Sequence, residues 1–170
     1  MNLKKNLVFL GMMGAGKSSI GNLVSKELNL KFIDTDTLIE DELGMSISNI
    51  FDEKGEGYFR NLEEKITLKV LKNNSSVISL GGGAFINEKI RKEILTNHYS
   101  FWLSWSESIL LKRIKNSKKR PLAFNSTDQG IKKLIKKRSK IYSKANFKIS
   151  CNNYTKTEIV KKIIEIHENN

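Results

Sequence analysis

The feature that most constrains this chain is a glycine-rich segment near its start, Gly11–Ser18, which reads GMMGAGKS. It matches the pattern G-x-x-x-x-G-K-[ST], in which successive backbone amides turn inward around phosphate oxygens. The apolar run 6–10 before it predicts a buried strand, and the apolar spacing of 17–28 predicts a helix. That helix would point the positive end of its dipole at the same anion. The segment therefore predicts an α/β protein that binds a nucleoside triphosphate.

Strand-like and helix-like segments alternate along the rest of the 170 residues. The patterns predict further strands at 30–33, 75–80, 99–104 and 147–150. They predict further helices starting at 37, 46, 58, 87, 106 and 155, and a long basic helix that ends near 143. The starts at Thr37 and Thr155 rest on capping boxes. This alternation predicts a parallel sheet with helices on both faces, and without an internal repeat or linker we expect one domain over 1–170.

The net charge of +12 is concentrated in one part of the chain. Between Lys112 and Lys148 there are fourteen Lys or Arg residues and a single acid, Asp128. Such a block could bind nucleic acid, a membrane surface or a highly charged small molecule. The interleaving of aromatic and basic residues that serves base stacking does not occur, and the longest apolar runs are too short to span a bilayer. We therefore expect small-molecule partners, with no nucleic acid and no membrane.

Cysteine usage and the first residues of the chain indicate the cellular compartment in which we expect the protein. The single cysteine, Cys151, allows no intramolecular disulfide and fits a reducing compartment. The segment MNLKKNLVFLGMMGAG roughly resembles a secretory signal, but its cleavage region would run into the lysine and serine of the phosphate loop. We therefore expect a cytoplasmic protein that keeps its first residues.

Two carboxylates follow the predicted strand 30–33. Residues two apart at a strand end face the same side, so we expect Asp34 and Asp36 both to face the phosphates. Asp34 would hold the water shell of Mg²⁺, and Asp36 would orient an acceptor hydroxyl and take its proton; helix capping is the alternative for Asp36. Within the loop, Lys17 would reach the β- and γ-phosphates and Ser18 would ligate Mg²⁺. Ser79 stands where a motor ATPase or a switch GTPase tends to place Asp, which favours a small-molecule kinase.

Further candidates lie downstream. Arg60 is followed three residues later by Glu63, and an arginine held by a carboxylate makes a bidentate clamp for a substrate carboxylate; a surface pair is the alternative. Gly81–Gly83 follow the strand 75–80, and ligands of such sheets bind beyond the carboxyl ends of strands. Phe51 and Phe59 are expected in the core rather than in a pocket wall.

Six ordered motifs together make the chain similar to the shikimate kinase family. They are the loop 11–18, Phe32-x-Asp34-x-Asp36, the segment Phe51–Glu63, Gly81–Gly83, Arg120-Pro121-Leu122 and Arg138-x-x-x-Tyr142. The resemblance implies ATP-dependent phosphorylation of the 3-hydroxyl of shikimate to shikimate 3-phosphate, a step of the chorismate and aromatic amino-acid pathway. It also implies the fold of nucleoside monophosphate kinases with strand order 2-3-1-4-5, substrate-binding helices at about 35–63, a lid at about 113–127, and a monomer.

The resemblance further implies site roles. Asp36 would meet the reacting hydroxyl, Arg60 with Arg138 would grip the carboxylate, and Gly82 would offer its backbone N–H to the substrate. Lys17 and Arg120 would neutralise the transferring phosphoryl group, while Mg²⁺ would be held by Ser18 and, through water, by Asp34. The ATP-binding residues implied are Gly14, Ala15, Gly16, Lys17, Ser18, Ser19, Arg113 and Arg120, with Arg113 stacked on adenine.

Two segments depart from the family pattern, and other readings stay open. The segment KNSKKRPLAFNSTDQG has no glycine before Arg120, and SCNNYTKTE lacks the basic or proline residue expected beside adenine, so Asn152 and Asn153 are candidates only. A gluconate or nucleoside kinase of the same fold is the nearest alternative. A nucleic-acid-binding protein with a vestigial nucleotide site is another. An inactive homologue used as a regulator would have lost Lys17, Asp36 or Arg60, and all three are present.

Overall fold

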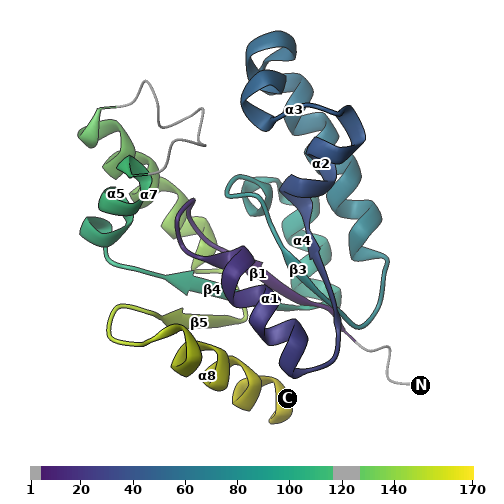
Figure 1. The fold of residues 1–170 in the computed structure, drawn as a ribbon, viewed down its shortest axis with the longest axis vertical. Helices are drawn as coiled ribbons and strands as arrows, with labels where there is room; N and C mark the ends of the chain where they lie inside the picture. Colours follow the sequence, from purple (N-terminus) through teal and green to yellow (C-terminus); the bar gives the residue numbers. More distant parts are fainter. Residues whose placement is uncertain (1–4, 117–126) are drawn as a thin grey trace.

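A five-stranded parallel sheet forms the centre of the computed structural model, which describes residues 5–116 and 127–170 (Figure 1). Its strand order is β2-β3-β1-β4-β5, which confirms the predicted architecture. The strands are β1 (Leu7–Leu10), β2 (Lys31–Asp34), β3 (Ser76–Ser79), β4 (Tyr99–Ser104) and β5 (Phe147–Ser150). The parallel register pairs Phe9 of β1 with Ser79 of β3 and with Phe101 of β4. All carboxyl ends therefore meet at one edge of the sheet.

Helices cover both faces of the sheet. They are α1 (Lys17–Glu27), α2 (Thr35–Leu43), α3 (Ile47–Leu71), α4 (Glu88–Asn97), α5 (Glu107–Lys115), α7 (Asp128–Tyr142) and α8 (Lys156–Glu168), with a short 3₁₀ helix η1 (Ala84–Ile86). α1 packs against α8 in front of the sheet, and α4 lies behind it (Figure 1). The pairs α2–α3 and α5–α7 rise on opposite sides of the carboxyl edge (Figure 1). Among the described helices, none combines the length and apolar character needed to span a membrane.

The core is built on the central strands. All four residues of β1 and all four of β3 are buried; β1 is therefore a continuous apolar run, whereas β3 carries a buried serine at each end. Across the sheet Phe9 stacks on Phe101 at 5.6 Å between ring centroids, and Phe101 stacks on Phe147 at 5.0 Å. Each fully buried ring contributes about 1.5–3 kcal/mol, so these contacts help to hold β1, β4 and β5 together.

The start of α2 differs from the prediction. The helix begins at Thr35 rather than Thr37, because the carboxylate of Asp34 is its N-cap. Asp34 Oδ1 accepts hydrogen bonds from the backbone N–H of Asp36 at 3.0 Å and of Thr37 at 3.4 Å. Glu40, predicted to close a capping box, instead accepts from the backbone N–H of Ile47 at 3.0 Å. The predicted box at Thr155 is confirmed.

α3 is one helix with a kink. The sequence predicts a break at Gly55 and Gly57 and a new helix from Tyr58, but only Gly55 leaves the helical conformation, with φ 80° and ψ 166°. The break at Gly55 is thus confirmed and the one at Gly57 is wrong. Across this kink the rings of Phe51 and Phe59 meet at 4.7 Å.

Candidate functional site

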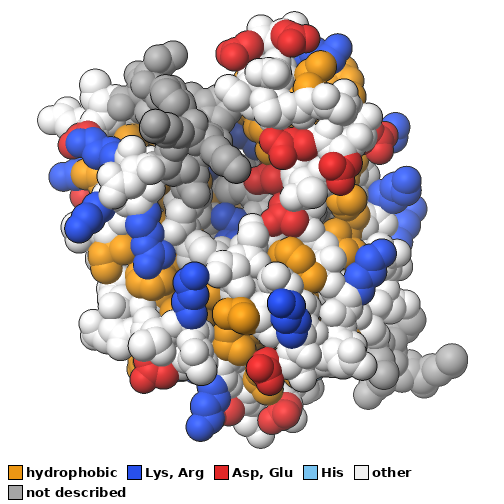
Figure 2. Space-filling view, in the orientation of Figure 1, with side chains coloured by type: hydrophobic (Ala, Val, Ile, Leu, Met, Phe, Trp, Pro, Cys, Tyr) orange, Lys and Arg blue, Asp and Glu red, His pale blue; other side chains and the backbone are white. Residues whose placement is uncertain are grey.

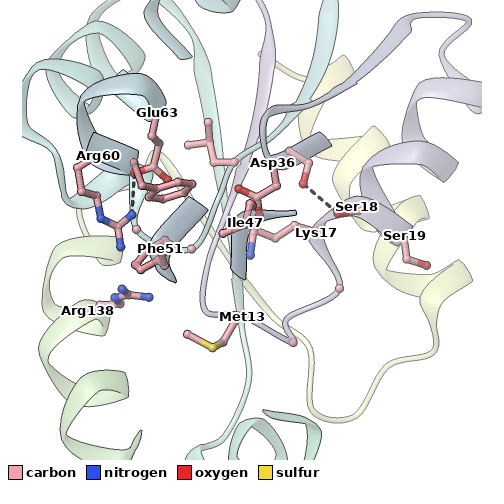
Figure 3. Close-up of a pocket in the computed structure, with 17 residues that line it drawn as sticks. Met13, Lys17, Ser18, Ser19, Asp36, Ile47, Phe51, Arg60, Glu63 and Arg138 are labelled. Carbon is pink, nitrogen blue, oxygen red and sulfur yellow. Dashed lines mark hydrogen bonds and ion pairs between the residues drawn. The ribbon is translucent and has the colours of Figure 1, made fainter. Parts of the chain in front are cut away.

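A cavity of about 420 Å³ opens at the carboxyl edge of the sheet, between the α2–α3 pair and α7 (Figure 3). Nine predicted site residues line it: Gly14, Gly16, Lys17, Ser18, Ser19, Asp36, Arg60, Gly82 and Arg138. Eight further residues line it, of which Glu63 and Gly83 belong to segments that the sequence already marked as candidates: Met13, Ile47, Phe51, Phe59, Glu63, Ser79, Leu80 and Gly83. The fold therefore gathers both predicted halves of the site, from segments far apart in the chain, around one space.

The phosphate loop holds its lysine inside the cavity. Gly16 is the N-cap of α1 and has the left-handed φ of 85° that suits glycine. The side chain of Lys17 is buried, and its Nζ donates to the carbonyl oxygens of Gly11 at 3.0 Å and Met12 at 3.1 Å. A positive charge is thereby kept beside the backbone amides at the start of α1, where a phosphate chain would bind.

Oxygen ligands gather around Ser18. Its hydroxyl donates to Asp34 Oδ2 at 2.5 Å and lies 3.3 Å from the hydroxyl of Ser79. Hydroxyl and carboxylate oxygens are the ligands that Mg²⁺ prefers, so these residues fit that ion. In the described part of the chain no group of three or more His, Cys, Asp or Glu could hold a metal. A magnesium ion would thus be shared with phosphate oxygens, as is usual for this ion.

Asp34 and Asp36 belong to different elements, although the prediction placed both at the end of one strand. β2 ends at Asp34, and Asp36 lies in the first turn of α2, so the two-residue alternation of a strand does not extend to it. Asp34 caps α2 and binds Ser18, whereas Asp36 lines the cavity. Helix capping was the alternative role for Asp36, but the residue that caps α2 is Asp34.

Asp36 is set up to hold a proton more firmly than an ordinary carboxyl group. Burial raises the pKa of Asp36 to about 6; the charge of Lys17 opposes this rise, and the nearby charges of Asp34 and Glu63 add to it. The backbone at Gly81 passes so close that a Cβ there would lie 2.6 Å from Asp36 Oδ1. A carboxyl group with a pKa near the working pH suits general base catalysis.

Arg60 is clamped by two acids. Its Nη1 donates to Glu63 Oε2 at 2.7 Å, which confirms the predicted partnership, and its Nη2 donates to Glu56 Oε1 at 3.2 Å. Glu63 is only 2% exposed, so this is not the surface pair of the alternative interpretation. Burial raises the pKa of Glu63, and the charge of Arg60 opposes that rise. The guanidinium of Arg60 is thus held in a fixed orientation at the cavity wall.

An aromatic wall supports the same arginine. Phe51 and Phe59 both line the cavity, so their assignment to the core alone is wrong, although Phe59 is also buried. The Arg60 guanidinium lies 5.1 Å from the ring centroid of Phe59. The kink at Gly55 brings both rings to the cavity, and a linear apolar pattern does not reveal such a kink. These rings offer an apolar surface to a ligand ring beside the charged groups.

Arg138 completes the acceptor end. It is only 8% exposed, and a Cβ added at Gly82 would lie 3.4 Å from its Nη1. Arg60 and Arg138 lie together on one side of the cavity, and Lys17 with Ser18 lies on the other (Figure 3). Two guanidinium groups on one side suit a carboxylate, and the phosphate loop on the other suits a triphosphate.

The basic block divides into a buried and an exposed part. Arg138 is the one buried residue among its described lysines and arginines. Lys115 is exposed and pairs with Asp128 at 2.8 Å. On the face in Figure 2 several lysines and arginines lie near one another over α5 and α7 and others are scattered, whereas acidic side chains gather over α2 and α3 beside the hollow. Of its described residues, the block thus contributes one side chain to the acceptor end, and the described lysines lie on the surface.

The nucleotide end contains a stack that sequence reasoning missed. Trp105 Nε1 donates to the carbonyl of Ala15 at 2.9 Å, and the Arg113 guanidinium lies 3.8 Å from the centroid of the Trp105 ring system. Arg113 Nη1 also donates to the carbonyl of Gly14 at 3.2 Å. Neither Ala15 nor Arg113 lines the cavity itself. The local sequence carries no signal for a contact across 90 residues.

Other predictions fall beside or outside the described structure. Asn152 accepts from the backbone N–H of Ser106 at 2.8 Å, which places it next to the start of α5. Arg120 and most of the predicted lid at about 113–127 lie outside the described residues.

A phosphate loop after the first strand of a 2-3-1-4-5 parallel sheet, opening on a cavity with an acid and two arginines, defines a P-loop kinase of small molecules. The family model described as shikimate kinase matches residues 13–168. The chain therefore belongs to the shikimate kinase family.

Individual relatives agree. A shikimate kinase of Thermodesulfovibrio yellowstonii is 38% identical over 165 residues, covering 96% of this chain and 95% of the relative. A structure of shikimate kinase from Acinetobacter baumannii in complex with shikimate superposes with a TM-score of 0.92 at 27% identity, covering 98% of this chain and 94% of that one. A gluconokinase from Sinorhizobium meliloti reaches a TM-score of 0.57 at 16% identity over 99% and 97% of the chains, which shows a shared fold alone. The gluconate kinase alternative is therefore not favoured.

Proposed function

We propose that this cavity transfers the γ-phosphoryl group of ATP to the 3-hydroxyl of shikimate, giving shikimate 3-phosphate and ADP. The activity is that of an ATP-dependent shikimate kinase of the chorismate and aromatic amino-acid pathway. The observation that carries the assignment to these residues is one cavity with a phosphate loop on one side and two buried or clamped arginines on the other. Asp36 lies in the same cavity.

At the acceptor end, Arg60 and Arg138 bind the carboxylate of shikimate. Glu63 and Glu56 fix the plane of the Arg60 guanidinium before substrate arrives, so little ordering remains to be done on binding. The backbone N–H of Gly82 meets the ring substituents, and the rings of Phe51 and Phe59 cover an apolar face. A rigid cyclic acid satisfies these groups together better than an open-chain sugar acid does.

At the reacting centre, Asp36 orients the 3-hydroxyl toward the γ-phosphorus. As the new O–P bond forms and the bond to the ADP oxygen breaks, the hydroxyl proton passes to the Asp36 carboxylate. Its pKa of about 6 supports this role, because the group is mostly ionised at neutral pH and is still a better base than an ordinary aspartate. The transition state of phosphoryl transfer is loose, so orientation contributes more than proton removal.

At the nucleotide end, the amides of 14–19 and the ammonium of Lys17 bind the phosphates. Ser18 and, through water, Asp34 would hold Mg²⁺, and this ion would supply charge neutralisation on the phosphate oxygens. Arg113, backed by Trp105, stacks on adenine. Arg120, outside the described residues, neutralises the transferring group, so Arg120→Ala should lower kcat by about 100-fold or more and leave KM for shikimate within about threefold.

We further propose that residues 1–170 act as one domain and as a monomer in the cytoplasm, without a nucleic-acid partner. Residues of one copy, from the phosphate loop to Arg138, line a single cavity, which supports a monomer as the catalytic unit. Lys17, Asp36 and Arg60 all line the cavity, which supports an active enzyme over an inactive regulator.

The test is an ADP-release assay with ATP and Mg²⁺ that compares shikimate, gluconate, a nucleoside monophosphate and no acceptor. We expect turnover with shikimate alone. Turnover with another acceptor would retain the phosphate-loop assignments and refute the acceptor assignments. A folded protein that binds ATP and turns over none of them would refute the proposed function.

A further inference from the structure

Tyr142 belongs to a motif of the sequence, yet the proposed function leaves it without a role. It is the last residue of α7 and only 1% exposed. Its hydroxyl donates to the backbone carbonyl of Gly82 and is also hydrogen-bonded to the side chain of Arg138. A buried tyrosine hydroxyl requires such partners, but these two belong to the acceptor end of the cavity.

The direction of both hydrogen bonds follows from the groups involved. A guanidinium has donors and no acceptor, and a carbonyl oxygen has no hydrogen, so the hydroxyl accepts from Arg138 and donates to Gly82. Burial raises the pKa of Tyr142 to about 12, so the hydroxyl keeps its proton over the working pH range. The tyrosine ring is in turn packed near Trp102 of β4, at 6.1 Å between ring centroids.

The hydrogen bond from Tyr142 restricts the backbone of Gly82 more than it restricts the side chain of Arg138. The carbonyl that Tyr142 holds belongs to the peptide between Gly82 and Gly83, so the bond limits rotation of the backbone beside the Gly82 amide. Glycine has the widest backbone freedom of any residue, and Gly82 lies in a run of three. The Tyr142 hydroxyl therefore connects the glycine backbone at Gly82, which lies 60 residues earlier in the sequence, to the long side chain of Arg138.

We propose that Tyr142 is a positioning residue for the acceptor: its hydroxyl sets the distance and angle between the Arg138 guanidinium and the Gly82 amide. This inference rests on the proposed function, in which those two groups bind the substrate. Tyr142 touches neither ATP nor the reacting atoms. Its contribution is to acceptor affinity, through the alignment of a carboxylate ligand and a backbone donor for one rigid ring.

The variant Tyr142→Phe keeps the ring that packs near Trp102 and removes only the hydroxyl. We expect KM for shikimate to rise by roughly five- to twentyfold, because the carbonyl of Gly82 loses its donor and the guanidinium of Arg138 loses an acceptor. KM for ATP and kcat should stay within about twofold of the wild type. The matched control is Tyr99→Phe, whose hydroxyl donates to the backbone carbonyl of Asn170 at 2.9 Å, away from the cavity. It should leave all three constants unchanged.

A double-mutant cycle tests whether Tyr142 acts through Arg138. Arg138→Ala should raise KM for shikimate by itself, and adding Tyr142→Phe to it should raise KM by less than it does in the wild type. A purely structural role would instead lower thermal stability and leave the KM for shikimate unchanged, or change both KM values together. Either of those results overturns the inference.

A second variant keeps the test valid if Tyr142→Phe does not fold. Incorporation of 4-aminophenylalanine at position 142 keeps a donor toward Gly82 but weakens the acceptor for Arg138, so KM for shikimate should rise while KM for ATP does not. A KM for shikimate equal to that of the wild type overturns the inference. The proposed function fails separately: wild-type protein would then not phosphorylate shikimate, or Arg138→Ala would leave KM for shikimate unchanged.

Discussion

The two ends of the cavity are built in different ways. At the acceptor end the functional groups are long charged side chains, and protein partners hold each of them: Arg60 pairs with Glu63 and Glu56, and Arg138 is buried against Tyr142. At the nucleotide end the groups are mainly backbone amides, with Ser18 and Ser19 exposed. Arg113 there is an exposed side chain stacked on Trp105.

The difference follows from the two ligands. A triphosphate presents many equivalent oxygens, and a helix start with successive amides binds them whatever the neighbouring side chains are. A small acid offers one carboxylate and a few hydroxyls, so recognition needs bidentate groups in one fixed geometry. The acceptor end must therefore be organised before binding, and changes to the groups that hold the acceptor should raise KM for shikimate more than changes around Trp105 and Arg113 raise KM for ATP.

Asp36→Asn should have the largest effect, because the reacting hydroxyl loses its base and its orienting charge. We expect kcat to fall by about 100- to 10,000-fold with KM for ATP little changed, measured by ADP release. A loss of less than about tenfold would mean that Asp36 is not at the reacting centre.

The same substitution should make the protein more stable at pH 7. The pKa of Asp36 in the folded protein is about 6 against an ordinary value of 3.8, so ionisation disfavours the folded state. This penalty is absent below pH 4, grows as pH rises and is complete above pH 6. Asp36→Asn removes it, which should raise the free energy of unfolding by about 1–3 kcal/mol at pH 7 and not at pH 4 in urea denaturation. An equal change in the free energy of unfolding at pH 7 and at pH 4 would contradict the raised pKa of Asp36.

Arg60→Lys tests whether geometry or charge matters at the acceptor end. Lysine keeps the positive charge but loses the planar fork, so KM for shikimate should rise by about 10- to 30-fold while KM for ATP stays within about twofold. The control is Arg91→Lys on α4; Arg91 does not line the cavity, and its Nη1 donates to the carbonyl of Ile86 at 2.8 Å. An unchanged KM for shikimate would show that charge alone suffices.

The pH dependence should report Asp36 at the acceptor end. The ionised form is the active one, so kcat/KM for shikimate should fall on the acid side with an apparent pKa of about 6, reaching roughly a tenfold loss at pH 5. Initial rates from pH 5 to 8 at saturating ATP measure this limb. If an Asp36→Asn variant with residual activity still lost kcat/KM for shikimate on the acid side, that loss would report the ionisation of another group.

Trp105→Phe should have the smallest effect. The variant keeps an aromatic face for Arg113 and loses the hydrogen bond to the Ala15 carbonyl. We expect KM for ATP to rise by about two- to fourfold and KM for shikimate to stay constant. A change larger than that of Arg60→Lys would reverse the proposed ranking of the two ends.

Short-range patterns predicted much of this molecule. The segments 99–104 and 147–150 are strands with those bounds, and the order of the sheet agrees with the family resemblance. The phosphate loop and the pairing of Arg60 with Glu63 were readable because both depend on neighbours within a few residues. Where two local signals competed, as at Thr37, the carboxylate of Asp34 caps the amides of Asp36 and Thr37, so the helix begins two residues before the predicted start.

By itself, then, the sequence determined the phosphate loop, the α/β alternation, the acid after β2 and the arginines of the acceptor end. The tertiary structure alone decided which of these groups share a cavity and what holds them there. Tyr142 meets Gly82 across 60 residues, Trp105 meets Ala15 across 90, and the kink at Gly55 brings Phe51 to the cavity. Spacing along a chain encodes helix and strand periods over a few residues, whereas such contacts depend on how whole elements pack.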